Sequence, residues 1–179
     1  MNINKATIQK CKEYNPQAQK FVYDALLPYL NSICKRYLSD SGSRSDVLQD
    51  AFIKIFTKIG QFDSNRGEFK SWTARIVINA CLQHGNKKIS RKETELTSIE
   101  YQIPMSPVII DRLSNEEILS VLRKMPKAYY QIFNLYIVDG FSHDEIATML
   151  EIKTSLSRKR LGRARDWIAS KTELRSMIS

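Results

Sequence analysis

The stretch HDEIATMLEIKTSLSRKRLGRAR, residues 143–165, decides how the C-terminal part of this chain folds. It predicts a short helix, then a turn too short for a strand, then a second helix. Ser142 and Glu145 form a capping box at the start of the first helix. Phe141 and Ile146 are spaced as a hydrophobic staple across the same start. Two independent signals therefore agree on one helix start, and the segment has the pattern of a helix-turn-helix.

The second helix of this segment has an apolar side and a basic side. It follows a turn at residues 151–153, and Thr154 or Ser155 is expected to cap it. Four residues recur at helical spacing and are expected to pack inward: Leu156, Leu161, Ala164 and Ile168. From Ile152 to Arg165 the chain carries six Lys or Arg and no acidic residue.

That basic side predicts an interface with nucleic acid. A helix with this many unpaired cations needs a polyanion to offset their repulsion, and DNA phosphate is the commonest one. The alternative is a solvated helix end, but the helix dipole disfavours cations in the first turn, where this set begins. The residues expected to contact duplex DNA are Ser157, Arg158, Lys159, Arg160, Gly162 and Arg163.

Length and charge fit one medium domain or two small ones, with attraction to nucleic acid or an anionic surface. The chain has 179 residues and a formal net charge of +9. No apolar run reaches membrane-spanning length, and the N-terminus lacks the hydrophobic core of a secretory signal. We therefore expect a cytoplasmic protein without membrane insertion.

Cysteine and histidine usage argues against a metal site or a disulfide framework. Cys11, Cys34 and Cys81 form no CxxC pair, and the two histidines lack metal-ligand spacing. Buried thiols in a reducing cytoplasm are the simpler interpretation, with a redox role for Cys34 and Cys81 as the alternative. No catalytic set and no phosphate-binding glycine loop is visible, so we expect neither an enzyme nor a cofactor.

Composition divides the chain into three segments. Residues 1–88 and 114–179 are basic and show helical periodicity, whereas residues 89–113 turn slightly acidic and contain two prolines. We therefore predict an all-α protein with two small helical domains joined by a linker, the C-terminal one a helix-turn-helix.

Several helices are expected in the N-terminal segment. Apolar residues recur at helical spacing within 17–38, where Pro28 predicts a kink or a restart. Ser43 and Asp46 resemble a capping box that opens the next helix. The sequence GQFDSNRG then breaks the chain, and a longer helix follows in FKSWTARIVINACLQHG.

One face of that longer helix is polar. Its stripe consists of Arg75, Asn79, Gln83 and Asn86. Amide and guanidinium groups on one helix face can hydrogen-bond to base edges and phosphates. A polar stripe is, however, more often simply the solvent-exposed face of a helix. The residues alone leave both interpretations open.

Two longer blocks carry a resemblance to a known family. They are DVLQDAFIKIFTKIGQFDSNRGEFKSWTARIVIN, and LRKMPKAYYQIFNLYIVDGFSHDEIATMLEI followed by SRKRLGRAR. The first resembles the second conserved region of bacterial RNA polymerase sigma factors of the extracytoplasmic-function (ECF) group, and the second resembles their fourth region. Both blocks in this order, with only a short linker between them, are typical of that group.

The resemblance implies a role for each domain. Residues 1–88 would bind core RNA polymerase and the minus-ten element, and residues 114–179 the minus-thirty-five element, through the basic helix. Implied polymerase contacts are Asp46, Gln49, Asp50 and Phe52. Implied contacts to the unwound minus-ten strand are Arg66, Lys70, Arg75, Asn79, Gln83 and Lys87. The family also implies an anti-sigma factor as partner, and we expect the chain to be a monomer.

The sequence departs from the family pattern in two places. HGN at 84–86 predicts that the long helix ends a turn early. TSLS opens the basic helix, where many members have a glycine-threonine pair.

Three other functions compete with this interpretation. A stand-alone helix-turn-helix regulator would dimerise and bind a palindrome without polymerase. A nuclease would need clustered carboxylates for magnesium, which are lacking. An RNA-binding adaptor would show no promoter dependence. The FDSNRGEFKSW loop has no task in the regulator interpretation.

Overall fold

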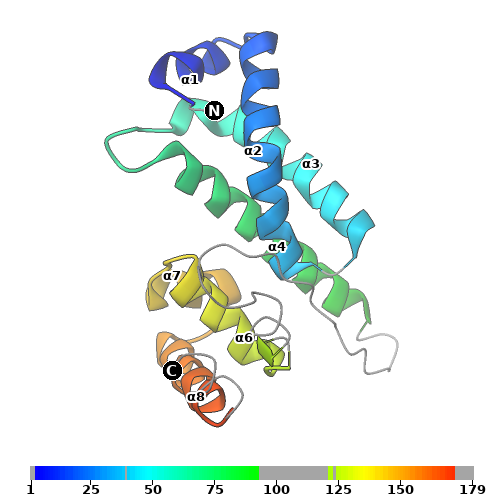
Figure 1. Cartoon of the computed structure of the whole chain (residues 1–179), viewed down its shortest axis with the longest axis vertical. Coiled ribbons are helices and arrows are strands. Elements are labelled where there is room, and N and C mark those ends of the chain that lie inside the picture. The colour runs from blue at the N-terminus through cyan, green and yellow to red at the C-terminus, as the bar shows by residue number, and fades with distance from the viewer. Residues whose placement is uncertain (1–2, 39, 93–120, 123, 172–179) are drawn as a thin grey trace. The chain divides into compact units, whose positions relative to one another are not determined.

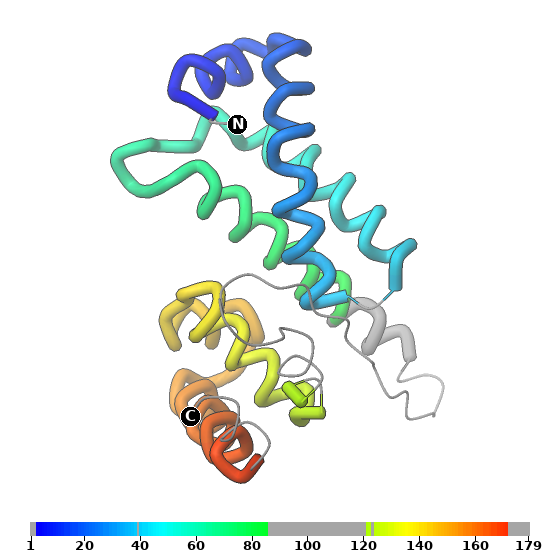
Figure 2. Tube along the Cα trace, in the orientation of Figure 1, coloured from blue at the N-terminus to red at the C-terminus, as the bar shows by residue number. Residues whose placement is uncertain are grey.

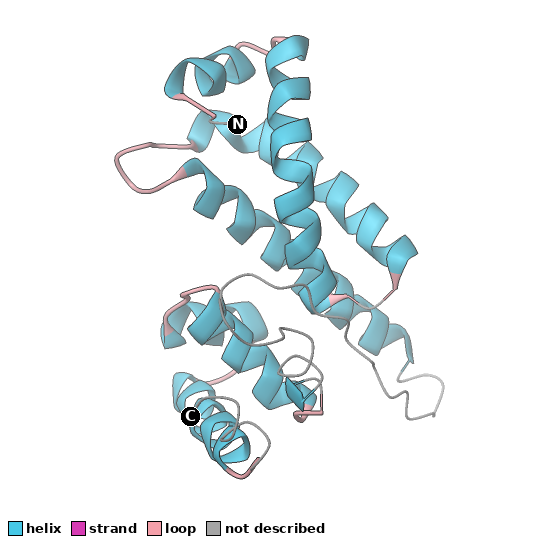
Figure 3. Cartoon of the chain, viewed as in Figure 1, coloured by secondary structure: helices cyan, strands magenta, loops and turns pink. Residues whose placement is uncertain are grey.

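The computed structural model describes residues 3–38, 40–92, 121–122 and 124–171. All regular structure in these ranges is helical, which confirms the predicted all-α class (Figure 3). The chain divides into two compact units, Met1–Ser106 and Pro107–Ser179. The predicted linker at 89–113 lies almost wholly outside the described residues, so its limits stay a prediction.

Three long helices build the core of the N-terminal unit, in which α2 and α3 both pack against α4 (Figures 1 and 2). The helices that the structure describes in this unit are α1 (Lys5–Lys12), α2 (Pro16–Tyr37), α3 (Ser41–Lys58), the short η1 (Ile59–Gln61) and α4 (Phe69–Lys92). The short α1 lies against α2. In the described ranges, no helix is long and apolar enough to cross a membrane.

Helix α2 is continuous where an interruption was expected. Asn15 caps it, and Pro16 occupies its first turn, where a missing N–H costs nothing. Pro28 lies inside the helix on an exposed position. Leu26 and Leu30 on either side of it are buried, and their packing outweighs the lost hydrogen bond.

Helix α3 starts earlier than predicted. Its N-cap is Asp40, whose side chain accepts a hydrogen bond of 2.7 Å from the Ser43 backbone N–H, so the expected capping box of Ser43 and Asp46 is wrong. Asp46 consequently lies in the second turn, beyond the N-terminal dipole that would have explained its charge.

Helix α4 continues past the expected early end. It runs to Lys92 with Gly85 in its interior, so the departure HGN does not stop it. A glycine inside a helix costs about 1 kcal/mol. Burial of Cys81 and Leu82 one turn before it offsets that cost.

Residues 124–171 of the C-terminal unit form α6 (Lys127–Phe133), η2 (Asn134–Val138), α7 (His143–Leu150) and α8 (Thr154–Ala169). A single helix was expected across the first two elements, but η2 is a π-helical turn, in which Asp139 N–H donates to Asn134 O at 2.9 Å. Gly140 follows with φ +73°, a conformation that favours glycine. Both α6 and α7 pack on α8.

The inward face of α8 differs from the prediction at its first turn. Leu161 and Ala164 are buried as expected, but Leu156 is 37% exposed, and Ser157 is buried in its place. Neither Thr154 nor Ser155 caps the helix, because Thr154 is its first residue and Lys153 its N-cap. The start of α8 is held by contacts to α7 instead.

Candidate nucleic-acid interfaces

The start of α7 is fixed by the predicted capping box. Ser142 N–H donates to Glu145 Oε2 at 2.8 Å, and Glu145 N–H donates to Ser142 Oγ at 3.2 Å. Phe141 and Ile146, the expected staple residues, are both buried. Helix α7 ends at Leu150. Its C-cap Glu151 adopts a left-handed conformation with φ 54°, and the chain turns there towards α8.

Two polar bridges hold the first turn of α8 against the first turn of α7. His143 Nδ1 lies 2.9 Å from Ser157 Oγ, and the Thr154 hydroxyl donates to Asp144 Oδ1 at 2.9 Å. The His143 ring also stacks on Tyr136, with 4.4 Å between ring centroids. These contacts fix the direction of α8. The helical periodicity of the sequence did not predict them.

Most of the predicted duplex contacts share one exposed surface of α8. Arg158, Lys159, Gly162 and Arg163 are exposed, and Arg160 is half-buried. Ser157 does not lie with them, because it is fully buried and bonded to His143. The Arg163 guanidinium donates to the Tyr129 hydroxyl at 3.4 Å, so α6 helps to orient it.

The bridge through His143 should make the C-terminal unit sensitive to pH. Burial lowers the pKa of His143, nearby Arg158 and Arg165 lower it further, and Asp144 opposes them. Since the unfolded chain then holds the proton more tightly, the free energy of unfolding should fall as pH drops through about 6.5. Urea unfolding followed by Trp167 fluorescence in a Trp72→Phe background tests this.

The matched variant is His143→Asn, which keeps a polar group near the Nδ1 position but does not titrate. It should flatten the pH dependence between about pH 7 and pH 5. An unchanged slope in His143→Asn would contradict the assignment of this dependence to His143.

The polar stripe on α4 lies on the surface of the N-terminal unit. Arg75, Asn79 and Gln83 are all exposed. Ala80 and Cys81 between them face the core. Asn86 and Lys87 belong to the last part of α4, whose side chains the structure does not describe.

An aromatic cluster supports the loop that precedes α4. The rings of Phe62, Phe69 and Trp72 have centroids 5.1 to 5.7 Å apart. Lys12 on α1 donates to Phe62 O at 3.1 Å and ties the start of the loop to the N-terminal helix. The loop residues 63–68 are exposed, including Arg66. Two buried phenylalanine rings and the half-buried Trp72 thus support an exposed polar loop.

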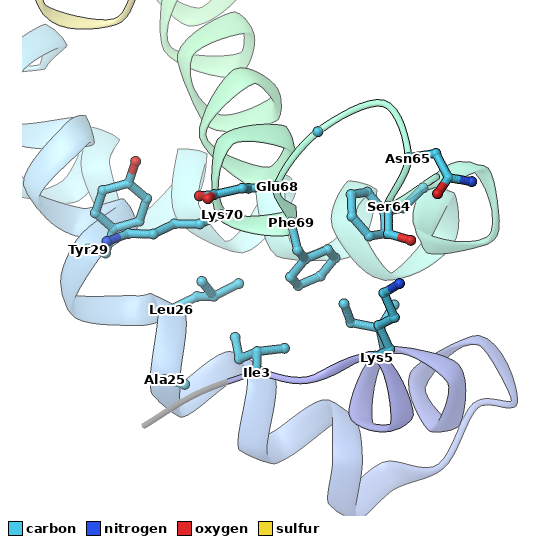
Figure 4. A pocket seen from close by; sticks show the side chains of 13 residues that line it. Ile3, Lys5, Ala25, Leu26, Tyr29, Ser64, Asn65, Glu68, Phe69 and Lys70 are labelled. Atoms are coloured by element: carbon cyan, nitrogen blue, oxygen red, sulfur yellow. The ribbon is translucent and has the colours of Figure 1, made fainter.

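A pocket of about 680 Å³ opens between this loop, α1 and α2 (Figure 4). Ile3, Leu26 and Phe69 provide apolar wall, and Ser64 and Asn65 of the loop line the opposite side (Figure 4). Lys70 stands over the Tyr29 ring, with its ammonium 4.2 Å from the ring centroid. The contribution of α1 was not predicted, because it depends on packing between segments far apart in the sequence.

The exposed face of α3 carries the predicted acidic residues. Asp46, Gln49 and Asp50 are exposed, and Ile53 continues the same face at 58% exposed. Phe52 is only 4% exposed and packs against Tyr23, with ring centroids 4.3 Å apart, so it belongs to the domain core. Ile53 was not predicted as part of this face. Its position could have been recognised, because it is an aliphatic residue on the polar side of the helix.

Comparison with known proteins assigns each unit to a conserved region. Residues 22–88 match the family model of sigma-70 region 2, and residues 115–168 match that of sigma-70 region 4. The two matches together cover more than half of the chain.

Curated relatives match along most of their length. The chain is 25% identical to the ECF RNA polymerase sigma factor SigW of Bacillus subtilis, with 97% of each chain covered. It is 28% identical to the ECF RNA polymerase sigma-E factor of Escherichia coli K12, covering 79% of this chain and 80% of that protein.

Solved structures share the fold. One is CnrH in complex with the cytosolic domain of CnrY, at a TM-score of 0.53 and 19% identity, covering 94% of this chain and 96% of CnrH. Another is the sigma factor RpoE of Bartonella quintana in complex with the anti-sigma factor NepR, at a TM-score of 0.53 and 18% identity, covering 89% and 95%. The two regional matches and the full-length relatives agree: the chain belongs to the sigma-70 family of RNA polymerase sigma factors, in its ECF group.

Proposed function

We infer that this chain is a sigma factor that binds core RNA polymerase and directs promoter-specific initiation of transcription. The observation that carries this is the match of both units, in order, to regions 2 and 4 of one family. Each unit also presents an exposed surface suited to a nucleic acid. The chain contributes binding and positioning, and the chemistry of RNA synthesis belongs to the polymerase.

For the predicted C-terminal domain, residues 114–179, we propose recognition of the minus-thirty-five duplex. Arg158, Lys159 and Arg163 are exposed on one helix whose start is fixed by two polar bridges. Guanidinium groups fork to guanine edges or to phosphate, and a glycine among them permits close approach of backbones. Ser157 supports this surface by holding His143, which gives it a positioning role in place of direct contact.

For the predicted N-terminal domain, residues 1–88, we propose capture of the unwound minus-ten strand. The support is the exposed loop over its aromatic platform, together with the amides of Asn79 and Gln83 on α4. Single-strand capture needs polar groups for base edges and a cationic track for the backbone. Arg66, Lys70, Arg75 and Lys87 supply that track in this proposal, with residues 89–113 as the linker.

We propose the exposed face of α3 as the polymerase-binding surface. Its acidic residues have no helix-dipole explanation, since the helix starts at Ser41 and Asp46 lies beyond the first turn. Ile53 adds an exposed apolar side chain beside them. An apolar centre with charged neighbours is the usual composition of a protein interface. In this proposal Ile53 takes the place that Phe52 was expected to hold.

Charge reversal on α3 should weaken the complex with polymerase. Asp50→Lys is expected to raise the Kd for core polymerase about tenfold, because it turns an attractive charge at the interface into a repulsive one. The matched control is Asp24→Lys, the same substitution at an exposed position of α2. Fluorescence anisotropy of labelled chain titrated with core enzyme measures both. Equal affinities would exclude this face.

We also propose that the chain is a cytoplasmic monomer with an anti-sigma factor as a further partner. The support is the solved structure of the similar sigma factor RpoE, which is in complex with the anti-sigma factor NepR. Co-purification of the tagged chain from its own host tests it.

Run-off transcription distinguishes the proposed function from its rivals. Core polymerase is supplied with a template carrying the upstream region of the gene for this chain, with and without the chain. A sigma factor yields a defined transcript only in the complete reaction. Polymerase-independent binding of a palindrome would favour a stand-alone regulator, and cleavage of naked DNA a nuclease.

A further inference from the structure

Two thiols lie next to each other inside the N-terminal unit. The sulfur atoms of Cys34 on α2 and Cys81 on α4 are 3.7 Å apart. Cys34 is fully buried and Cys81 is 2% exposed. The residues are 47 apart in sequence, so only the packing of α2 on α4 brings them together.

The distance is that of two neighbouring reduced thiols. A disulfide has an S–S length of about 2.05 Å, so the two sulfurs must approach by less than ~2 Å to form a bond. Rotation of two side chains and a small shift of one helix provide that much movement. Cys11, the third cysteine of the chain, is also buried and serves as an internal comparison.

We propose that Cys34 and Cys81 are a site of reversible disulfide formation by a small peroxide oxidant. Cys34 reacts first in this scheme, because it lies in the last turn of α2, which ends at Tyr37. Helix ends open more readily than helix interiors, and such opening admits a molecule as small as hydrogen peroxide. Cys81, in the interior of α4, then resolves the product.

Two steps balance the reaction. The Cys34 thiol loses its proton, and the thiolate attacks one peroxide oxygen as the O–O bond breaks. Cys34 sulfenic acid forms, and the departing hydroxide takes up the proton and leaves as water. The Cys81 sulfur then attacks the Cys34 sulfur, the S–O bond breaks, the S–S bond forms and a second water leaves. Two thiols are oxidised by two electrons in total, and one peroxide is reduced to two waters.

The crosslink would join α4 to α2 within the segment that carries the proposed minus-ten residues. Cys81 lies between Asn79 and Gln83 on α4. Closing a loop of this length removes conformations from the unfolded chain and should raise the Tm of the N-terminal unit by ~10 °C. Formation of the bond is independent of the proposed function, and only the minus-ten role of the residues beside Cys81 rests on that function.

The test uses the full-length chain. Reduced, desalted protein is treated with hydrogen peroxide, denatured, assayed for thiols and mapped by mass spectrometry without reduction. We expect the thiols to fall from three to one per chain, with Cys34 and Cys81 in one linked peptide. Dithiothreitol should restore all three, and the Tm should return to that of the untreated protein.

Variants sharpen the result. Cys11→Ala should still lose two thiols, whereas Cys34→Ala and Cys81→Ala should each lose the linked peptide. The proposal is overturned by three intact thiols at a peroxide dose that oxidises the urea-unfolded chain, by linkage through Cys11, or by disulfides between chains. Peptide mapping of the wild-type protein needs no variant to fold. A chain that forms this bond but directs no transcription would refute the proposed function alone.

Discussion

Leu161→Ala is expected to lower the free energy of unfolding of the C-terminal unit by about 2–5 kcal/mol. Leu161 is 3% exposed and faces the core from the middle of α8, against which α6 and α7 both pack. Truncation leaves a cavity where three helices meet, in a unit too small to rebuild its packing elsewhere.

Urea unfolding followed by Trp167 fluorescence, in a Trp72→Phe background, reports this unit separately. The chain has only two tryptophans, and Trp72 belongs to the other unit. Separate reporting matters because a protein of two units need not unfold in one step.

The neighbouring residue supplies the matched control. Gly162 is exposed within the same helix, and a Cβ added to it meets no heavy atom within 4 Å. Gly162→Ala should therefore raise the free energy of unfolding by about 0.5–1 kcal/mol, because alanine loses less entropy on entering a helix. Two adjacent substitutions with opposite signs test the inward face of α8. If Leu161→Ala did not lower the free energy of unfolding relative to Gly162→Ala, the described packing would be wrong.

Replacing both Arg158 and Arg163 by alanine should abolish most of the affinity of the polymerase complex for promoter duplex. Each arginine that forks to a base or clamps a phosphate contributes about 1–3 kcal/mol, so the double variant should lose on the order of a hundredfold or more. Both side chains are exposed on one surface, and neither is buried in the core. The salt dependence of binding should also become shallower, by about one counterion per lost phosphate contact.

Filter binding of the complete complex to labelled promoter, from about 50 to 200 mM salt, measures both quantities. Lys171→Ala is the control within the same unit, since Lys171 lies just beyond α8 over the Trp167 ring. Affinity for core polymerase should be unchanged in both variants. A double variant that binds promoter as wild type would remove α8 from the interface.

Local signals in the sequence predicted the helix-turn-helix well. The capping box of Ser142 and Glu145 is a pattern within four residues, and the structure forms both of its hydrogen bonds. The inward positions Leu161 and Ala164 follow from helical spacing alone. Features that depend on a few neighbouring residues can be derived without knowledge of the rest of the chain.

Predictions failed where distant segments decide the outcome. Leu156 was expected inside because it is apolar, but Ser157 occupies that position because His143 on the preceding helix offers it a partner. Phe52 was expected at a polymerase interface, but Tyr23 on another helix covers it. No short pattern records such pairings, since each joins side chains from two helices.

The polar stripe on α4 was predicted in its position but not in its role. Spacing placed Arg75, Asn79 and Gln83 on one face, and all three are exposed. Exposure alone does not distinguish a surface that binds nucleic acid from an ordinary solvent-exposed helix face. The family match adds what the residues could not provide, because it assigns the whole block to region 2.

The π turn at Asn134–Val138 has a consequence for length variation among related chains. An N–H that reaches five residues back encloses one residue more than an α-helical turn does. Deleting a single residue there would let the segment close as ordinary α-helix and would rotate Ile137 and Val138 away from their exposed positions. Homologues one residue shorter between α6 and α7 should therefore align with their gap at this turn.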